Sequence, residues 1–537
     1  MSFRILSIYL LLIFSETLFG QKNDDASHGI SLLGARSSFD NVVINNQPDQ
    51  DQRNVTICSS VNGWLFAAYT HIQNNVEWVT ILKSVDSGHS WEIISDVSSD
   101  TPSWRFKKLQ VISCGLDTNN LKLLFGMSIY VTGGGFYLGV VDRFDVNTAS
   151  WEGDILEDYS REIYDIAIAS DDLFPASGSN PGSIAAIYFK RYQHDSIYFC
   201  VSDNGGQSFT TRRNIAGTNK RLGKVSLTYG RSSSFPNGRY FAAWEEKETD
   251  NSLFGHIYTA HSEPNFNSSF TNPICIDLSD SSLNNKVRYP VISSQASNFD
   301  NDSSDLTTLI TCEHYVNSSQ NLNINGFYNK KSVSGTGFHS FACSTDQHNK
   351  LTPDVAFNPY DSTFMITYFD STDLKLPYAI NSVNMISPDT WNYFSTGYNI
   401  DLNLSKPAPS IRIDHSKNSG MVCWVGERSN GNGKAMFSTP LLFPVGIHDN
   451  QVNSFAIKTY PNPASNVFNL ELKLSISQVV NVSLYNEIGS EVFVNKEVLC
   501  KPEKNLIMVD VSSLHPGLYI FKISCQEGFT TGKVIVK

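Results

Sequence analysis

The chain has 537 residues, with 40 Lys or Arg against 52 Asp or Glu, so its formal net charge is -12 and its pI is near 5.5. This acidic balance excludes a typical nucleic-acid binder, which needs a basic surface. Only 17% of the residues are charged and 12% are aromatic, which excludes a disordered chain and favours a β-rich fold with a large core. Length alone predicts several domains of ordinary size.

The amino end has the pattern of a secretory signal peptide. Arg4 precedes an apolar run over residues 5–14, and the small residue Gly20 stands before Gln21. This run is too short to span a bilayer as a helix, and no later stretch is apolar for long enough. We predict a signal peptide over residues 1–20 and no membrane span in the mature chain. A buried N-terminal helix is the alternative.

Between residues 30 and 445 one apolar strand recurs, with an aromatic residue near the end of most copies. Clear copies end at residues 69, 188, 244, 368 and 424, and looser ones at 127 and 312. The mean spacing is about 59 residues, so seven copies fill the interval. Each copy has a shorter strand before it and a third strand after it. This predicts an all-β, seven-bladed β-propeller over residues 30–445, with six or eight blades as alternatives.

Prolines stand in the short strands that precede three of the copies, at Pro290, Pro353 and Pro409. Proline has no N–H to donate to a sheet and is tolerated at the first position of a strand. We therefore expect each proline to open its strand.

Two turns of the repeat share one pattern. Residues 84–91 fit S-x-D-x-G-x-[ST]-W, and residues 202–209 are a weaker copy with Asn204 in the place of Asp86. They resemble the Asp-box (BNR) hairpins of sialidases and sialidase-like propellers. We predict a structural role, in which Asp86 accepts hydrogen bonds from backbone N–H groups, a glycine supplies positive φ and Trp91 packs between sheets. A functional role for Asp86 or Trp91 is the alternative.

The sialidase resemblance implies three arginines that bind a carboxylate, a Tyr nucleophile activated by Glu, and an Asp acid/base. The nearest match to the family's [FY]-R-I-P motif is Val287-Arg288-Tyr289-Pro290, in the fifth repeat instead of the first. Lysine, which lacks the arginine fork, stands at this register elsewhere, at Lys224, Lys286, Lys350 and Lys406. Because the arginine triad is not evident, sialidase chemistry is the alternative hypothesis.

Acidic residues follow the repeated strand in four consecutive repeats, at Glu245 with Glu246, Glu313, Asp370 and Glu427. In a propeller this position lies on the same rim as the start of each first strand. Our low-ranked site candidates are therefore Glu245, Glu313, Asp370, Glu427 and Arg288, lining a polar cleft. Pairing of these acids with the lysines is the alternative.

Aromatic residues lie beside these acids, at Tyr69, Tyr188, Trp244, Tyr368 and Trp424. We expect them to fill the core between blades. Service as stacking platforms for sugars is the alternative.

From about residue 446 the sequence changes to short alternating strands, which predicts a compact Ig-like β-sandwich over residues 446–537. Its motifs are Tyr460-Pro461-Asn462-Pro463, then Pro516-Gly517-Leu518-Tyr519, then the closing Gly532-Lys533-Val534-Ile535-Val536-Lys537. In this order and place they resemble the type A C-terminal sorting domain of the type IX secretion system. The resemblance implies that the translocon and a sortase-like peptidase are partners. It also implies release from, or attachment to, the outer-membrane surface of a Gram-negative bacterium.

Nine cysteines without close pairs exclude a repeated CxxC zinc site and a dense disulfide framework. Cys500 and Cys525 are the one pair that we would test for a bridge. The acidic stretch 300–305 lacks the glycine and distal glutamate of a calcium loop, so we interpret it as a solvated turn. We predict no cofactor and no metal.

The sequence thus indicates a secreted or cell-surface propeller that binds glycans or proteins on its rim. A sialidase-like glycoside hydrolase using rim carboxylates is the alternative. The sequence favours a binding protein over an enzyme.

Overall fold

A computed structural model describes residues 42–438 and 457–537 with gaps, and the signal-peptide prediction for residues 1–20 lies outside it. The gaps are 61, 100–101, 116–120, 159–161, 172–182, 192, 211, 233, 264–269, 279–282, 284–285, 297–304, 317–319, 336, 344–346, 360–361, 375, 383–391, 396–407, 415–418, 475–476, 487–490 and 526–527. The described part contains strands, and it has no helix that could cross a membrane. The chain folds into two compact units, with a boundary near residue 442.

The described part of the larger unit contains seven four-stranded antiparallel sheets, here called blades 1 to 7 in the order of their first strands. The first strands are β2 (Asp51–Ser59), β6 (Trp104–Cys114), β10 (Ile163–Ser170), β14 (Arg221–Ser232), β18 (Val287–Ser294), β22 (Lys350–Asn358) and β26 (Ser410–Asp414). The second strands are β3 (Leu65–Gln73), β7 (Lys122–Val131), β11 (Ile184–Lys190), β15 (Phe235–Lys247), β19 (Thr308–Val316), β23 (Thr363–Asp370) and β27 (Ser419–Glu427).

The outer half of each blade is made of two further strands. The third strands are β4 (Val76–Ser84), β8 (Phe136–Asp145), β12 (Asp195–Ser202), β16 (His256–His261), β20 (Asn321–Asn329), β24 (Pro377–Ser382) and β28 (Gly433–Ser438). The fourth strands are β5 (Glu92–Ser98), β9 (Ser150–Asp158), β13 (Arg213–Thr218), β17 (Ile274–Cys275), β21 (His339–Ala342), β25 (Asn392–Ser395) and, in blade 7, β1 (Val42–Val43).

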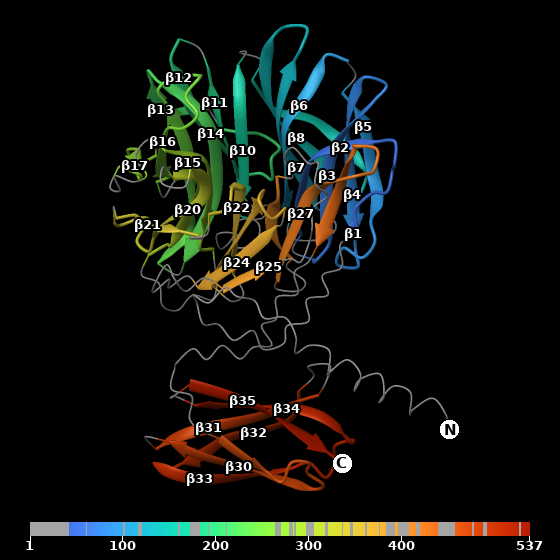
Figure 1. Cartoon of the computed structure of the whole chain (residues 1–537), viewed down its shortest axis with the longest axis vertical. Coiled ribbons are helices and arrows are strands. Elements are labelled where there is room, and N and C mark those ends of the chain that lie inside the picture. Colours follow the sequence, from blue (N-terminus) through green and yellow to red (C-terminus); the bar gives the residue numbers. More distant parts are fainter. Residues whose placement is uncertain are drawn as a thin grey trace. The chain divides into compact units, whose positions relative to one another are not determined.

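The blades close into a ring. Each first strand contacts the first strand of the next blade, and β26 of blade 7 contacts β2 of blade 1. The ring is fastened by β1, which comes from the start of the described chain and pairs with β28, so the blue and orange ends of the propeller lie side by side (Figure 1). The seven-bladed propeller predicted from the repeat is confirmed. Each of the seven recurring strands is the second strand of its blade.

The second strands are buried on both faces because each blade lies between two others. In β3, Phe66 and Ala68 pack with residues of blade 2, whereas Leu65, Ala67 and Tyr69 pack with residues of blade 7. All five side chains are fully buried. A strand that is buried on both faces needs a continuous apolar run instead of alternation, and the small alanines let neighbouring sheets approach. This is the physical reason for the sequence repeat.

The aromatic residues near the ends of these strands fill the core, as expected. Tyr69, Tyr188, Trp244, Tyr368 and Trp424 are at most 3% exposed. They therefore do not offer open stacking faces to a sugar. This repeated position supplies five of the chain's buried aromatic residues.

The two patterned turns join the third and fourth strands of blades 1 and 3 and make the same hydrogen bonds. In the first, Asp86 Oδ1 accepts the N–H of Ser90 at 2.9 Å, and Ser84 Oγ accepts the N–H of Gly88 at 2.8 Å. In the second, Asn204 Oδ1 accepts the N–H of Ser208 at 3.0 Å, and a serine hydroxyl again accepts a glycine N–H. Positive φ at Gly88 and Gly206 completes both turns.

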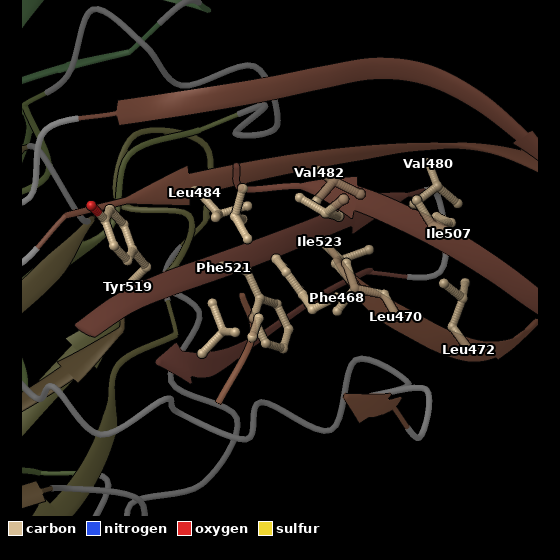
Figure 2. Packing of buried hydrophobic residues seen from close by; sticks show 14 of the residues in the cluster. Phe468, Leu470, Leu472, Val480, Val482, Leu484, Ile507, Tyr519, Phe521 and Ile523 are labelled. Atoms are coloured by element: carbon tan, nitrogen blue, oxygen red, sulfur yellow. The ribbon is translucent and has the colours of Figure 1, made fainter. Parts of the chain in front are cut away.

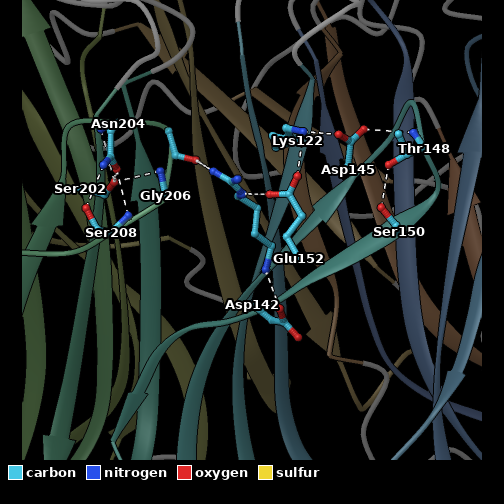
Figure 3. Close-up of polar contacts among 12 residues, drawn as sticks. Lys122, Asp142, Asp145, Thr148, Ser150, Glu152, Ser202, Asn204, Gly206 and Ser208 are labelled. Carbon is cyan, nitrogen blue, oxygen red and sulfur yellow. Dashed lines mark hydrogen bonds and ion pairs between the residues drawn. The ribbon is translucent and has the colours of Figure 1, made fainter.

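Figure 3 shows the second turn beside a network of charged side chains in blade 2. Lys122 pairs with Asp145 and Glu152, and Arg143 pairs with Glu152. Arg143 Nη1 also donates to the carbonyl oxygen of Gly205 at 3.2 Å. The network therefore fastens blade 2 to the turn of blade 3, which gives these charges a structural role.

The smaller unit is a sandwich of two antiparallel sheets. One sheet has the order β29 (Ile457–Tyr460), β30 (Val467–Leu474), β33 (Glu503–Asp510). The other has the order β32 (Glu491–Cys500), β31 (Gln478–Tyr485), β34 (Gly517–Cys525), β35 (Gly528–Val536). Alternate residues of each strand enter one core, as Phe468, Leu470 and Leu472 do in β30 (Figure 2).

The first and last motifs of this sandwich meet in space. The Asn462 amide donates to the carbonyl oxygen of Lys533 at 3.0 Å, and Asn462 Oδ1 accepts the N–H of Ile535 at 2.9 Å. The tetrapeptide that opens the domain is thus paired with its last strand, which explains why both ends carry fixed sequence patterns. Cys500 is buried, but the side chain of Cys525 lies outside the described part, so their pairing stays a prediction.

The shared geometry of the two turns yields a stability prediction. Asp86→Ala removes the acceptor of the Ser90 N–H and Oγ–H and should lower the free energy of unfolding by about 1–3 kcal/mol. Asp86→Asn should cost much less, because Asn204 already does this work in the second turn. Urea unfolding measures both. The control is Asp203→Ala, an exposed side chain next to Asn204. Equal costs for the alanine and asparagine variants of Asp86 would contradict the structural role.

Hydrogen bonds from Ser90 lower the pKa of Asp86 to about 2. A carboxyl whose folded pKa lies below its unfolded value stabilises the fold above the unfolded value, near pH 4. The Asp86 contribution should therefore be lost as the pH falls from about 4 towards 2. The Asp86→Asn variant should not show this loss.

Candidate functional site

Of the seven first strands that the structure describes, six have a β-bulge near the rim where they begin. Register shifts occur at this level in β2, β6, β10, β14, β18 and β22. Positive φ at Asn54, Tyr289 and Thr352 belongs to three of these bulges. Pro290 and Pro353 stand at the bulges in β18 and β22 and not at the strand starts, so our expectation for those two was wrong; Pro409 directly precedes β26. A bulge tolerates proline because the ladder is already interrupted there.

A bulge frees backbone N–H groups, and carboxylates of the preceding blade accept them. Glu313 Oε1 of blade 5 accepts the N–H of Thr352 at 2.8 Å. Glu245 Oε2 of blade 4 lies 3.4 Å from the N–H of Tyr289. Two outer-strand acids do the same, with Glu77 accepting from blade 2 and Asp195 from blade 4. Glu245 and Glu313 therefore tie blades together, at 0% and 1% exposure.

The other two acids among our candidates lie apart from this system. Asp370 Oδ1 accepts the N–H groups of Thr372 and Asp373 within its own turn, and its Oδ2 lies 2.9 Å from His348 Nδ1. Glu427 is partly exposed at the end of β27. The candidate acids thus occupy equivalent strand ends but take different local partners.

The rim lysines also differ in their burial and in their partners. Lys350 is fully buried, and its Nζ donates to Asn323 Oδ1 and to the carbonyl oxygen of His348, each at 3.4 Å. Lys224 is partly exposed and lies in the bulge of β14, Lys286 precedes β18, and Lys406 lies outside the described part. Lysines at one sequence register therefore do not form one basic surface.

Charged side chains of five first strands gather around the propeller axis at the level of the bulges. They are Lys108, Asp165, Lys224, Asp354 and Arg412. Lys108 Nζ lies 2.9 Å from Asp165 Oδ1, and Arg412 Nη1 lies 2.8 Å from Asp354 Oδ2. Although burial opposes ionisation, Lys108 and Lys224 hold the pKa of Asp165 below its usual range. Sequence reasoning missed Lys108, Asp165, Asp354 and Arg412.

Arg288 has a distinct environment on the rim between blades 4 and 5. Its Nε donates to Glu313 Oε2 at 2.6 Å. Its guanidinium carbon lies 5.1 Å from the ring centre of Phe254 and 5.0 Å from that of Tyr289, and the Phe254 ring stacks on Tyr315. All four side chains are partly exposed. We call Phe254, Arg288, Tyr289 and Tyr315 the Arg288 ledge.

The ledge leaves the outer end of Arg288 available. Within the described residues, neither Nη1 nor Nη2 of Arg288 has a hydrogen-bond partner, because Glu313 uses only Nε. A guanidinium close to two aromatic rings, whose two terminal nitrogens have no partner among the described residues, can bind a carboxylate or a pair of sugar hydroxyls. Sequence reasoning found Arg288 through its motif but missed Phe254 and Tyr315, which come from other segments.

Comparison with known proteins identifies one part of the chain. Residues 458–537 match the family described as the secretion system C-terminal sorting domain. This confirms the sorting domain inferred from the motifs at both ends of the sandwich. No curated protein matches the chain.

Solved structures with a similar course of the backbone include several carbohydrate-active proteins. An α-L-arabinofuranosidase from Fusarium graminearum is 11% identical over 75% of this chain and 98% of its own, with a TM-score of 0.41. An α-L-arabinanase from Penicillium chrysogenum is 14% identical over 74% and 97%, with a TM-score of 0.40. A Hadza microbial sialidase is 10% identical over 72% and 66%, with a TM-score of 0.37. Similarities this low leave the activity to be argued from the residues of this chain.

The axial ion pair gives a second prediction. Lys108→Met leaves Asp165, which is 2% exposed, without its nearest cation and should lower the free energy of unfolding by about 3–5 kcal/mol. Adding Asp165→Asn should recover part of this loss. The control is Lys107→Met at the exposed neighbouring position, which should change little.

The cost of Lys108→Met should also depend on pH. Without Lys108, burial raises the folded pKa of Asp165. The loss of unfolding free energy caused by Lys108→Met should therefore be largest at neutral pH and should shrink as acid protonates the Asp165 carboxyl. Chemical unfolding at pH 7 and pH 5 measures the difference. A cost that is the same at both pH values would show that Asp165 does not depend on Lys108.

Proposed function

Because residues 458–537 are a type IX C-terminal sorting domain, and the protein is thereby directed to the outer-membrane surface or the extracellular space, we propose that the propeller is an exported binding module for glycans. The ligand binds at the rim, on the Arg288 ledge. The observation that carries this proposal is the guanidinium of Arg288, fixed by Glu313 and two aromatic rings with its terminal nitrogens open.

The chemistry of the ledge matches sugars better than a purely apolar partner. Aromatic rings stack on the C–H faces of sugars, and an arginine fork recognises carboxylates or paired hydroxyls. The partly exposed rings of Tyr289, Phe254 and Tyr315 supply the first kind of contact, and Arg288 supplies the second. We therefore expect carboxylate-bearing glycans to bind more tightly than neutral ones.

The contacts of Glu313 and the burial of Glu245 favour binding over catalysis. Both oxygens of Glu313 are engaged, one by Arg288 and one by the backbone of Thr352. Glu245 is fully enclosed between blades. A general acid or nucleophile must reach the substrate, and neither carboxyl is open to the rim.

A sialidase-like hydrolase remains the second candidate, on one observation. Burial raises the pKa of Glu245, although Lys247 Nζ lies 3.3 Å from its Oε1 and opposes this rise. A carboxyl with a raised pKa is a candidate general acid. For this role, Glu245 would have to become accessible when substrate binds.

The binding proposal is tested with arginine variants of the full chain. Arg288→Lys keeps the charge but loses the fork, and it should weaken binding on a glycan array and in titrations with the best ligand about tenfold or more. Arg288→Ala should weaken it further. The matched control is Arg105→Lys, at the second position of β6 as Arg288 is of β18. Glycan binding that survives both Arg288 variants would exclude the ledge as the site.

The hydrolase alternative predicts that the wild-type chain cleaves fluorogenic sialosides. Under the binding proposal, we expect no turnover of these substrates. Turnover that disappears in Glu245→Gln, while the circular dichroism spectrum and Tm stay unchanged, would instead establish the enzyme. Glu246→Gln, the neighbouring acid on the opposite face of β15, serves as the control.

A further inference from the structure

The outer half of blade 4 gathers a histidine, a cysteine and two acids on one face. In the sheet register, Glu246 of β15 is opposite His256 of β16, and Tyr258 is opposite Cys275 of β17. Asp277 lies two residues after Cys275 and therefore returns to the same face as His256. Strand pairing thus brings together residues that are up to 31 positions apart in the sequence.

The donor atoms of three of these residues are close. His256 Nδ1 lies 2.9 Å from Asp277 Oδ2, and Cys275 Sγ lies 3.3 Å from Asp277 Oδ1. One nitrogen, one sulfur and one oxygen donor, from His256, Cys275 and Asp277, all lie within 4.8 Å of one another. Ligand atoms around tetrahedral zinc are separated by roughly 3–4 Å, as bond lengths of about 2.0–2.3 Å require. The trio needs only small side-chain adjustments to reach that geometry.

Part of this arrangement has a structural explanation. Asp277 is fully buried, and its Oδ1 accepts the N–H of Ile257 at 2.9 Å, which holds β17 to β16. That bond accounts for the aspartate but not for the thiol and imidazole that face it. Of the eight cysteines whose side chains are described, seven are buried, and Cys275 is the one that is partly exposed. An exported protein has little structural use for a thiol near its surface.

A small cavity opens on the same side of blade 4 as His256. It has a volume of about 120 Å³ and lies between blades 3 and 4, with Thr218, Glu246, Tyr258 and Pro273 among its lining residues. Glu246 is the register partner of His256, so the cavity reaches the face that carries the donors. A water molecule entering from this cavity could supply the fourth ligand. A site with three protein ligands and an open position is the arrangement of exchangeable and catalytic zinc.

We propose that His256, Cys275 and Asp277 form a zinc-binding site on the outer edge of blade 4. The mixed nitrogen, sulfur and oxygen donors suit Zn²⁺, whereas Ca²⁺ and Mg²⁺ prefer oxygen ligands alone. Binding replaces the S–H proton of Cys275 by a Zn–S bond and releases that proton to solvent. The sequence predicted no metal here because the three residues form no spaced motif. This site is independent of the Arg288 ledge.

The test uses the full chain after treatment with a chelator. Titration with Zn²⁺ and elemental analysis should give one equivalent of bound zinc. Substitution by Co²⁺ should give a sulfur-to-metal charge-transfer band. Cys275→Ser should abolish that band, and both Cys275→Ser and His256→Ala should weaken zinc binding at least tenfold. The matched control is His348→Ala, which alters the similar group of His348, Asp370 and Asp373 and should leave zinc binding unchanged.

A measurement on the wild-type chain tests the site even if a variant does not fold. Zn²⁺ should slow the alkylation of the Cys275 thiol, and peptide mass spectrometry measures the alkylated fraction. Three outcomes would overturn the site: no zinc bound at one equivalent, unchanged binding in folded Cys275→Ser, or alkylation of Cys275 at the same rate with and without zinc. Loss of zinc in His348→Ala alone would assign the metal to the other group and equally overturn the proposal.

Discussion

The propeller depends on hydrogen bonds that run from side chains of one blade to the backbone of the next blade's first strand. Thr56 accepts from Val111, Gln110 from Ile168, Asp165 from Val225, Ser226 from Ile292 and Asp354 from Ile411. Neighbouring first strands in a propeller do not share a sheet, so their inward N–H groups would otherwise be buried without partners. The acceptor differs in chemistry from blade to blade, but its place does not. The hydrophobic strands fill the space between blades, and these bonds fix the rotation of each blade about the axis.

This constraint also decides what the rim acids can do. Glu245 and Glu313 lie at the level where bulges free N–H groups, and they satisfy those groups across the blade boundary. These two acids are therefore explained by the architecture before any ligand is considered. Arg288 is different, because the architecture uses its Nε only. Function is best sought where a side chain has bonding capacity that the fold does not consume.

The sequence predicted the scaffold well because the scaffold is repetitive. Seven copies of a doubly buried strand leave an apolar signal that can be read from residues such as Ala67 and Ala242 alone. The turn at Asp86 and the motif at Asn462 were equally recognisable in the sequence. Asp86 makes its contacts within one short turn, and Asn462 contacts the patterned last strand of its domain. The sites were less readable. The Phe254 ring comes to Arg288 from the connection between β15 and β16 of another blade. The partners of Cys275 are set by strand register, which the sequence does not encode locally.

The repeat also indicates where specific chemistry can be accommodated. Both proposed sites belong to blades 4 and 5, and blade 4 has unusual strand lengths. The strands β14 and β15, of 12 and 13 residues, are the longest that the structure describes in the propeller, whereas β17 has only two residues. The short fourth strand ends at Cys275, the partly exposed thiol of the proposed zinc site. A position that is the same in every blade serves closure of the ring. A position that only one blade possesses is free to bind a ligand.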